Sequence, residues 1–244
     1  MYPGKYAEQN PDRSAFVMAA TGERVSYQEF EARSNRVAHY LADKGLGFQD
    51  HYSIFMENNN RYLESCAAGE RSGLYFTCIN SFLTSDELAY IINNSESQIL
   101  ITSMSKLEAA QEALAQCTAI KEVLVVGAGD ADLPEGMSDF ASTLSKYPET
   151  PLERELLGAA MLYSSGTTGR PKGIVRPLPE QSPSEPLPVI GFLSGLWRYR
   201  EDMIYLSPAP LYHAAPLRWC LAMTKFGMTR IVMEKFDPEQ YLAL

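Results

Sequence analysis

Hydrophobic and polar residues follow one another along this chain in blocks that predict alternating strands and helices. Short apolar runs bounded by turn residues are typical of buried strands, and they occur at 15–18, 52–56, 74–79, 98–102, 122–126, 159–162, 203–207 and 229–233. Segments with apolar residues three or four positions apart lie between many of these runs, as in amphipathic helices. This alternation favours an α/β fold with largely parallel sheets flanked by helices.

Local signals mark where several helices begin and end. Ser26 with Glu29, and Thr84 with Glu87, each place a hydroxyl residue three positions before a glutamate, which is the pattern of a capping box. Gly45 is placed to end the helix that Ser26 begins. Asp237 before Pro238 predicts a further helix start near the end of the chain. Other helices are expected at 61–72, 106–116, 189–199 and 218–226.

Two stretches interrupt the alternation of strands and helices. Glycines and acidic residues from 127 to 136 indicate a surface loop, and we expect a subdomain break within 127–158. Five prolines fall within 177–188, which excludes a regular helix or a central strand there. We interpret this second stretch as an exposed proline-rich loop, with a proline-rich partner motif as the alternative.

Composition narrows the class of protein. With 244 residues, of which 45% are hydrophobic, the chain is long enough to bury a sizeable core. A net charge of −9 argues against nonspecific nucleic-acid binding, which needs a basic surface. The four cysteines have no C-x-x-C spacing, so we expect buried thiols and neither a zinc site nor a disulfide framework. We find no signal-peptide pattern and no 18-residue apolar span, and therefore expect a soluble, cytoplasmic protein without a transmembrane segment.

The strongest chemical signal is the string Y-S-S-G-T-T-G-R-P-K-G at 163–173, directly after an apolar run. Glycines let a backbone approach a phosphate closely, hydroxyls donate hydrogen bonds, and a lysine supplies positive charge. The string is not a Walker A motif, because Gly169 is followed by Arg170 and Pro171 instead of Lys and Ser or Thr. Its residue types nevertheless indicate a phosphate-binding loop.

In its residue order this string resembles the phosphate loop of the adenylate-forming superfamily, which includes acyl-CoA synthetases, aryl-CoA ligases, luciferases and amino-acid adenylation domains. Weaker similarities follow in the expected order: S-Y-Q-E-F at 26–30, a G-x-x-x-x-x-I-N strand at 73–80 and P-L-Y-H at 210–213. Cys78 departs from the family pattern, since it stands where a proline is usual. The resemblance covers almost the whole chain and favours the branch of fatty-acid:CoA ligases.

The resemblance implies which residues bind which ligand. ATP and Mg²⁺ are the expected cofactors, coenzyme A is a co-substrate, and the partner is a small-molecule carboxylic acid. Tyr212 and His213 are expected to border the acid pocket, and Thr168 is the expected hydroxyl ligand of Mg²⁺. The apolar side chains Phe192, Leu193, Trp197, Leu217 and Trp219 are candidates for lining the pocket, although core packing explains them equally well. The residues expected at the ATP phosphates are Ser164, Ser165, Gly166, Thr167, Thr168, Gly169 and Lys172.

The resemblance is limited to the N-terminal portion of the family's large domain, which residues 1–244 represent. The family's later Y-G-x-T-E and T-G-D segments are absent from the sequence, so no catalytic residue is assigned. We therefore expect a fragment of a ligase that does not complete the reaction alone. Two alternatives stay open: a noncatalytic nucleotide- or partner-binding module derived from such an enzyme, and an amino-acid or aryl-acid adenylation domain.

Overall fold

The structure is a computed structural model that describes residues 3–164 and 170–244. Its larger sheet has six strands in the order β7-β6-β5-β3-β4-β8, and every neighbouring pair is parallel. This sheet confirms the α/β class expected from the strand–helix alternation. The strands are β3 (His51–Phe55), β4 (Tyr75–Cys78), β5 (Ile99–Ser103), β6 (Glu122–Val126), β7 (Met137–Asp139) and β8 (Ala159–Ala160).

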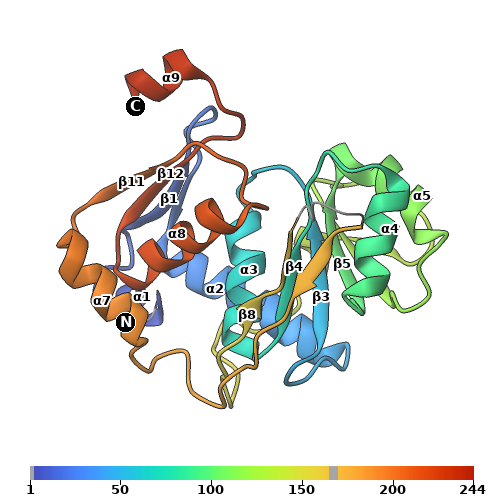
Figure 1. Ribbon diagram of the computed structural model, residues 1–244, viewed down its shortest axis with the longest axis horizontal. Helices are drawn as coiled ribbons and strands as arrows, with labels where there is room; N and C mark the ends of the chain where they lie inside the picture. Colours follow the sequence, from blue (N-terminus) through green and yellow to red (C-terminus); the bar gives the residue numbers. More distant parts are fainter. Residues whose placement is uncertain (1–2, 165–169) are drawn as a thin grey trace.

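A second sheet brings together the two ends of the chain (Figure 1). Its order is β11-β12-β1-β2, with β1 parallel to β12, β12 parallel to β11, and only β2 antiparallel. The N-terminal strands therefore need residues more than 200 positions later to form their sheet. The strands are β1 (Ser14–Met18), β2 (Arg24–Ser26), β11 (Ile204–Ser207) and β12 (Thr229–Val232).

Helices fill the space between the sheets and cover the far side of the larger one (Figure 1). Residues of α2 (Tyr27–Asp43), α3 (Tyr62–Ser72) and α8 (Ala214–Lys225) form one core with both sheets. Those of α4 (Ser85–Asn94) and α5 (Leu107–Leu114) form a second core. The remaining helices are α1 (Pro3–Gln9), the 3-10 helix η1 (Met104–Lys106), α6 (Phe140–Leu144), α7 (Pro188–Trp197) and α9 (Pro238–Ala243).

Side chains along each central strand alternate between the two faces of the sheet, so one strand contributes to two hydrophobic cores. Ile99 and Ile101 of β5 point into the core with α2 and α3, whereas Leu100 points into the core with α4 and α5. Successive side chains of a strand point to opposite faces, so a parallel strand with helices on both faces is apolar at nearly every position. This accounts for the continuous apolar runs in the sequence.

Both predicted capping boxes form. The Ser26 hydroxyl accepts a hydrogen bond from the Glu29 N–H at 3.1 Å, and the Glu29 carboxylate accepts one from the Ser26 N–H at 2.8 Å. Thr84 and Glu87 repeat this arrangement at the start of α4. Gly45 has a φ of +82° directly after α2, a conformation that glycine adopts without the steric cost of a Cβ.

One strand prediction was wrong. The apolar run 159–162 was expected to form a single buried strand, but only Ala159 and Ala160 join the six-stranded sheet as β8. Leu162–Ser164 forms β9, which pairs antiparallel with β10 (Lys172–Ile174) as a hairpin. The run contains both a short strand of the larger sheet and the start of a hairpin. Hydropathy alone does not mark the boundary between β8 and β9.

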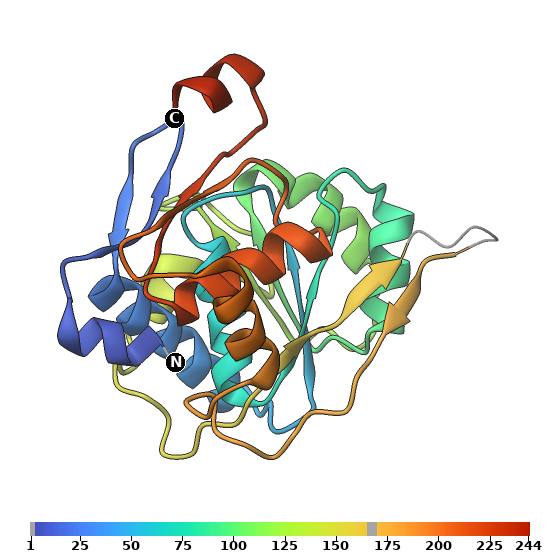
Figure 2. The ribbon, with the colours of Figure 1, turned by 60° about the vertical axis from the view of Figure 1, so that its left-hand side comes forward.

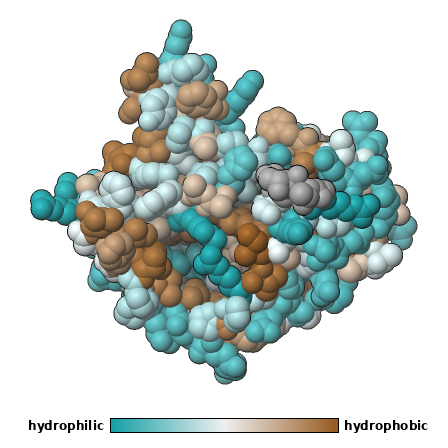
Figure 3. Space-filling view, viewed as in Figure 1, coloured by the Kyte–Doolittle hydropathy of each residue, from teal (hydrophilic) through white to brown (hydrophobic). Residues whose placement is uncertain are grey.

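The two stretches that interrupt the predicted alternation differ in the structure. β7 and α6 lie within 127–158, and β7 extends the larger sheet, whereas the subdomain break expected there stays a prediction. Residues 175–187 contain neither helix nor strand, and α7 starts at Pro188. α7 exposes four large apolar side chains, Val189, Phe192, Leu196 and Trp197. Figure 3 shows brown, hydrophobic surface over the region of α7. None of the helices in the described ranges has the length and hydrophobicity to cross a lipid bilayer.

Candidate functional site

The order of strands in the larger sheet defines one edge where a ligand site is expected. From β3 the chain moves to its neighbour β4 on one side, and then crosses to β5 on the other side. In open parallel sheets, ligands bind outside the carboxyl ends of the strands near such a reversal. The chain leaves β3 toward Asn58, and leaves β8 toward the β9–β10 hairpin, at this same carboxyl edge.

The β9–β10 hairpin carries the two described members of the predicted phosphate loop. Ser164 and Lys172 are direct partners in its register, followed by Tyr163 opposite Gly173. The side chains of both Ser164 and Lys172 are exposed. The hairpin extends away from the sheet in Figure 2. Five predicted phosphate-site residues lie outside the described residues: Ser165, Gly166, Thr167, Thr168, which was also the expected Mg²⁺ ligand, and Gly169.

Helix α4 holds both ends of this hairpin. The Tyr163 hydroxyl donates to the Asn94 side-chain oxygen at 2.7 Å, and the Tyr90 hydroxyl donates to the Pro171 carbonyl at 3.1 Å. The Arg170 guanidinium lies 5.0 Å from the centre of the Tyr90 ring, within the range of a cation–π contact. Burial raises the pKa of Tyr163, so its hydroxyl keeps its proton further into the alkaline range than an exposed tyrosine does.

Tyr90 and Asn94 were not singled out from the sequence. They lie four positions apart and therefore on one face of α4. The sequence gives no sign that this face meets a segment about 70 to 80 residues further along, because that contact depends on the order of the strands. The anchoring of the β9–β10 hairpin by α4 is thus a property of the tertiary fold.

Lys172 supplies positive charge beside the loop. Within the part of the chain that the structure describes, its ammonium group makes no ion pair, and its side chain is exposed. An exposed lysine opposite an exposed serine is suited to meet an anionic group from solvent. In a chain with a net charge of −9, such a cation matters for attracting phosphate.

Tyr212 and His213 lie between β11 and α8. Their ring centres are 4.4 Å apart with the planes tilted by 52°. Tyr212 is half-buried, and burial raises the pKa of its hydroxyl. His213 is exposed and occupies the N-cap of α8 without a side-chain capping bond. Its imidazole is therefore available to a ligand.

Four of the five apolar side chains considered for an acid pocket lie in separate environments. Leu217 lies in the core shared by the two sheets. Trp219 packs against a small cluster that includes Tyr199 and Phe226. Phe192 and Trp197 are exposed on α7. Core packing and surface exposure therefore account for four of these residues, and the pocket's apolar lining stays unassigned.

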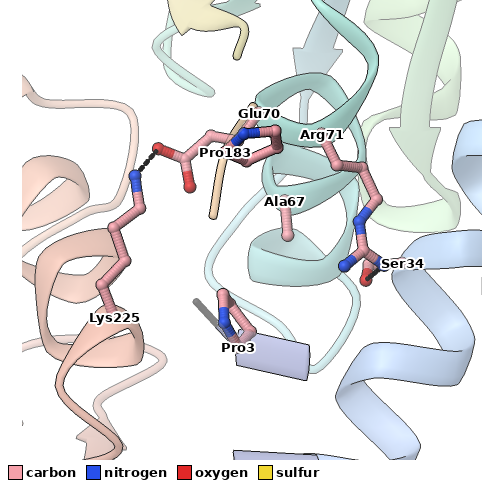
Figure 4. Close-up of a pocket in the computed structure, with 7 residues that line it drawn as sticks. All are labelled: Pro3, Ser34, Ala67, Glu70, Arg71, Pro183 and Lys225. Carbon is pink, nitrogen blue, oxygen red and sulfur yellow. Dashed lines mark hydrogen bonds and ion pairs between the residues drawn. The ribbon is translucent and has the colours of Figure 1, made fainter. Parts of the chain in front are cut away.

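Two concave regions elsewhere are poorly suited to a nucleotide. The cavity in Figure 4 has a volume of about 20 Å³, room for a single water, and Lys225 on its wall is paired with Glu70 at 2.9 Å. A more open groove of about 580 Å³ is lined by three glutamates, namely Glu8, Glu31 and Glu149, against one lysine, Lys5. Glu31 and Glu149 are paired with Arg71 and Arg36, so among the described lining residues only the Lys5 cation could attract a phosphate.

The fold and this site define an α/β protein with the candidate β9–β10 hairpin at the carboxyl edge of a parallel sheet. The sequence matches the AMP-binding enzyme family over residues 5–244, and the chain belongs to this family. It is 27% identical to 4-coumarate–CoA ligase 1 of Petroselinum crispum over 96% of this chain and 42% of that ligase. It is 31% identical to 3-oxocholest-4-en-26-oate–CoA ligase of Rhodococcus rhodochrous over 68% of this chain and 30% of that ligase.

Solved structures agree with this assignment. ATP-bound MatB from Rhodopseudomonas palustris superposes with a TM-score of 0.75 at 27% identity, over 100% of this chain and 48% of MatB. The N-terminal domain of FACL13 from Mycobacterium tuberculosis has the same fold, with a TM-score of 0.78 at 22% identity over 99% of this chain and 58% of that domain. The chain spans less than half the length of the curated ligases that it matches.

Proposed function

We propose that this protein, at its natural length, activates an apolar carboxylic acid with ATP and transfers the acyl group to coenzyme A. The observation that carries this proposal is the hairpin that presents Ser164 opposite Lys172, in a chain of the AMP-binding enzyme family. The names of two relatives give 4-coumarate and 3-oxocholest-4-en-26-oate as the acids that those ligases join to coenzyme A. Fatty acids are the first candidates for the substrate of this chain.

The reaction has two steps. In the first, a carboxylate oxygen attacks the α-phosphorus of ATP, and the bond to the β-phosphate oxygen breaks to release pyrophosphate. In the second, the thiol sulfur of coenzyme A attacks the acyl carbonyl, loses its proton, and displaces AMP. Neither step requires a protein nucleophile. The protein acts by positioning the reactants and stabilising charge on the phosphates.

In this mechanism the described residues have distinct tasks. Lys172 neutralises charge on the β- and γ-phosphates as pyrophosphate departs, and the Ser164 hydroxyl donates to a phosphate oxygen. Tyr212 and His213 border the acid, between β11 and α8. Mg²⁺ would accompany the nucleotide and offset the negative charge of its phosphates, and Thr168 is the residue proposed to hold it through its hydroxyl.

The direct test is acid-dependent exchange of labelled pyrophosphate into ATP by the natural full-length protein. Hexadecanoate and 4-coumarate are the test acids. A set of amino acids is assayed as the competing class of substrate, and ATP without any acid is the blank. We expect exchange with an apolar acid, followed by an acyl-CoA product of the corresponding mass when coenzyme A is added. Exchange that depends on an amino acid instead would assign the protein to the adenylation domains. ATP binding without exchange for any acid would support a noncatalytic module.

A further inference from the structure

Asn58 connects the two sheets at the edge where the candidate site lies. It follows the end of β3 in the larger sheet, and its side chain is 6% exposed. Its amide nitrogen donates to the carbonyls of Met233 at 2.8 Å and Ala209 at 3.2 Å. Its amide oxygen accepts from the Leu211 N–H at 2.8 Å. All three partners are backbone groups at the end of the smaller sheet.

The backbone of the segment that Asn58 binds makes few other hydrogen bonds, although Leu211 is buried in the core shared by the two sheets. Residues 208–213 follow β11 and belong to neither a strand nor a helix. Pro208 and Pro210 have no N–H to donate, so this segment cannot form a regular strand ladder. One backbone bond within it is that from the His213 N–H to the Pro210 carbonyl at 3.2 Å. The Asn58 amide therefore takes the place of a neighbouring peptide group.

The other end of this connection is also fixed. Glu57, the preceding residue, accepts hydrogen bonds from the hydroxyls of Ser103, the last residue of β5, at 2.7 Å and of Ser105, in η1, at 2.6 Å. The turn after β3 is thereby tied to β5 on one side, and through Asn58 to the smaller sheet on the other. The same larger sheet continues through β8 into the β9–β10 hairpin. Asn58 thus links the Tyr212–His213 segment to the larger sheet, from which the chain continues into the hairpin that carries Lys172.

We propose that Asn58 is a positioning residue that holds Tyr212 and His213 in register with the phosphate hairpin, so that a bound acid meets the nucleotide at the correct distance. This proposal rests on the proposed function, in which Tyr212 and His213 border the acid. Attack of a carboxylate on phosphorus is sensitive to displacement, because an error of about 1 Å costs roughly 100-fold in rate. Asn58 itself contacts neither reactant.

The first test is independent of activity. In the natural full-length protein, Asn58→Ala should lower the hydrogen-exchange protection of the Leu211 amide, measured by mass spectrometry on peptides covering 207–217. Asn60→Ala is the matched control, because Asn60 lies two positions further and bonds to Glu23 at the surface. We expect the control to exchange like the wild type. Unchanged exchange at Leu211 in Asn58→Ala would overturn the proposal.

The second test uses Asn58→Asp, which keeps the size of the side chain and the acceptor for Leu211 but loses both donors. We expect kcat/KM for the acid to fall by about 10- to 100-fold, with KM for ATP within about twofold of the wild type. An equal fall in kcat/KM for the acid and for ATP, or no fall in kcat/KM for the acid, would contradict a positioning role. If the wild-type protein exchanges no pyrophosphate with any acid, the proposed function fails, and the Leu211 exchange still decides whether Asn58 holds the segment.

Discussion

At the scale of single residues, the core contains an acid that is costly to ionise. The Glu64 side chain on α3 is 1% exposed, and one of its carboxyl oxygens has no hydrogen-bond partner among the described residues. Burial raises the pKa of Glu64 to about 7, and the nearby guanidiniums of Arg61 and Arg33 offset this only in part. The ion pair with Arg61, at 3.3 Å, is therefore weaker than the loss of hydration.

This pKa predicts how stability depends on pH. The folded chain binds a proton at Glu64 more tightly than the unfolded chain does, so this residue's contribution is complete below about pH 4.5 and lost as the pH rises through 7. Glu64→Gln should match the wild type at pH 5 and exceed it at pH 8.5 by about 1–3 kcal/mol in the free energy of unfolding. Urea unfolding at both pH values measures this difference. A variant that is less stable at pH 8.5 would show that the ionised carboxylate is well paired.

Residue-scale predictions from the sequence succeeded where a residue acts within its own segment. Ser26 and Thr84 cap the helices directly after them, as expected. Residues that act across the fold could not be found in this way. Tyr90, Asn94 and Asn58 bind segments 81, 69 and 153 positions away, and nothing in their local sequence distinguishes them from surface polar residues.

At the scale of elements, β8 depends on a close backbone approach. A Cβ built on Gly158, the residue before β8, would lie 2.1 Å from the Gly69 carbonyl oxygen and 2.4 Å from the Leu74 carbonyl oxygen. Both are main-chain atoms of α3 or its connection to β4, so neither can turn aside. Only glycine allows the chain to enter the sheet at this point and continue into the phosphate hairpin.

Gly158→Ala should therefore destabilise the protein, by about 1–3 kcal/mol or more, because the added methyl group forces backbone to move. Gly191→Ala on α7 is the control, since a Cβ there meets nothing within 4 Å, and alanine is the better helix former. We expect that control to be neutral or slightly stabilising. The measurement is the free energy of unfolding of each variant in denaturant. Equal stability of Gly158→Ala and the wild type would mean that β8 shifts freely.

Sequence patterns identified most elements but not their partners. The central strands and the helices between them have clear apolar periodicity, which is why their positions agree with the expectation. The division of the strands into two sheets, and the hairpin formed by 162–164 and 172–174, depend on pairing between distant or very short segments. Three-residue strands leave too little alternation for a periodic signal to appear.

At the scale of the whole molecule, two sheets meet at one edge that carries both halves of the candidate site. The phosphate hairpin continues from the larger sheet, and Tyr212 and His213 follow the smaller one. The chain belongs to the AMP-binding enzyme family, and under the proposed function one half would bind the nucleotide and the other the acid. The order of residues in the S-S-G-T-T-G-R-P-K-G string predicted this family, whereas the way α4 and Asn58 hold the site emerged only from the tertiary structure.

The central claim is that the hairpin binds the phosphates of ATP, and Lys172→Ala tests it most directly. Calorimetric titration with ATP and with pyrophosphate should give affinities about 10- to 100-fold weaker than the wild type, because a charge-assisted contact of roughly 1.5–3 kcal/mol is lost. Lys146→Ala, which removes an exposed lysine outside the site, should leave both affinities unchanged. Unchanged affinities in Lys172→Ala, with the fold intact by circular dichroism, would contradict the assignment of this hairpin as the phosphate site.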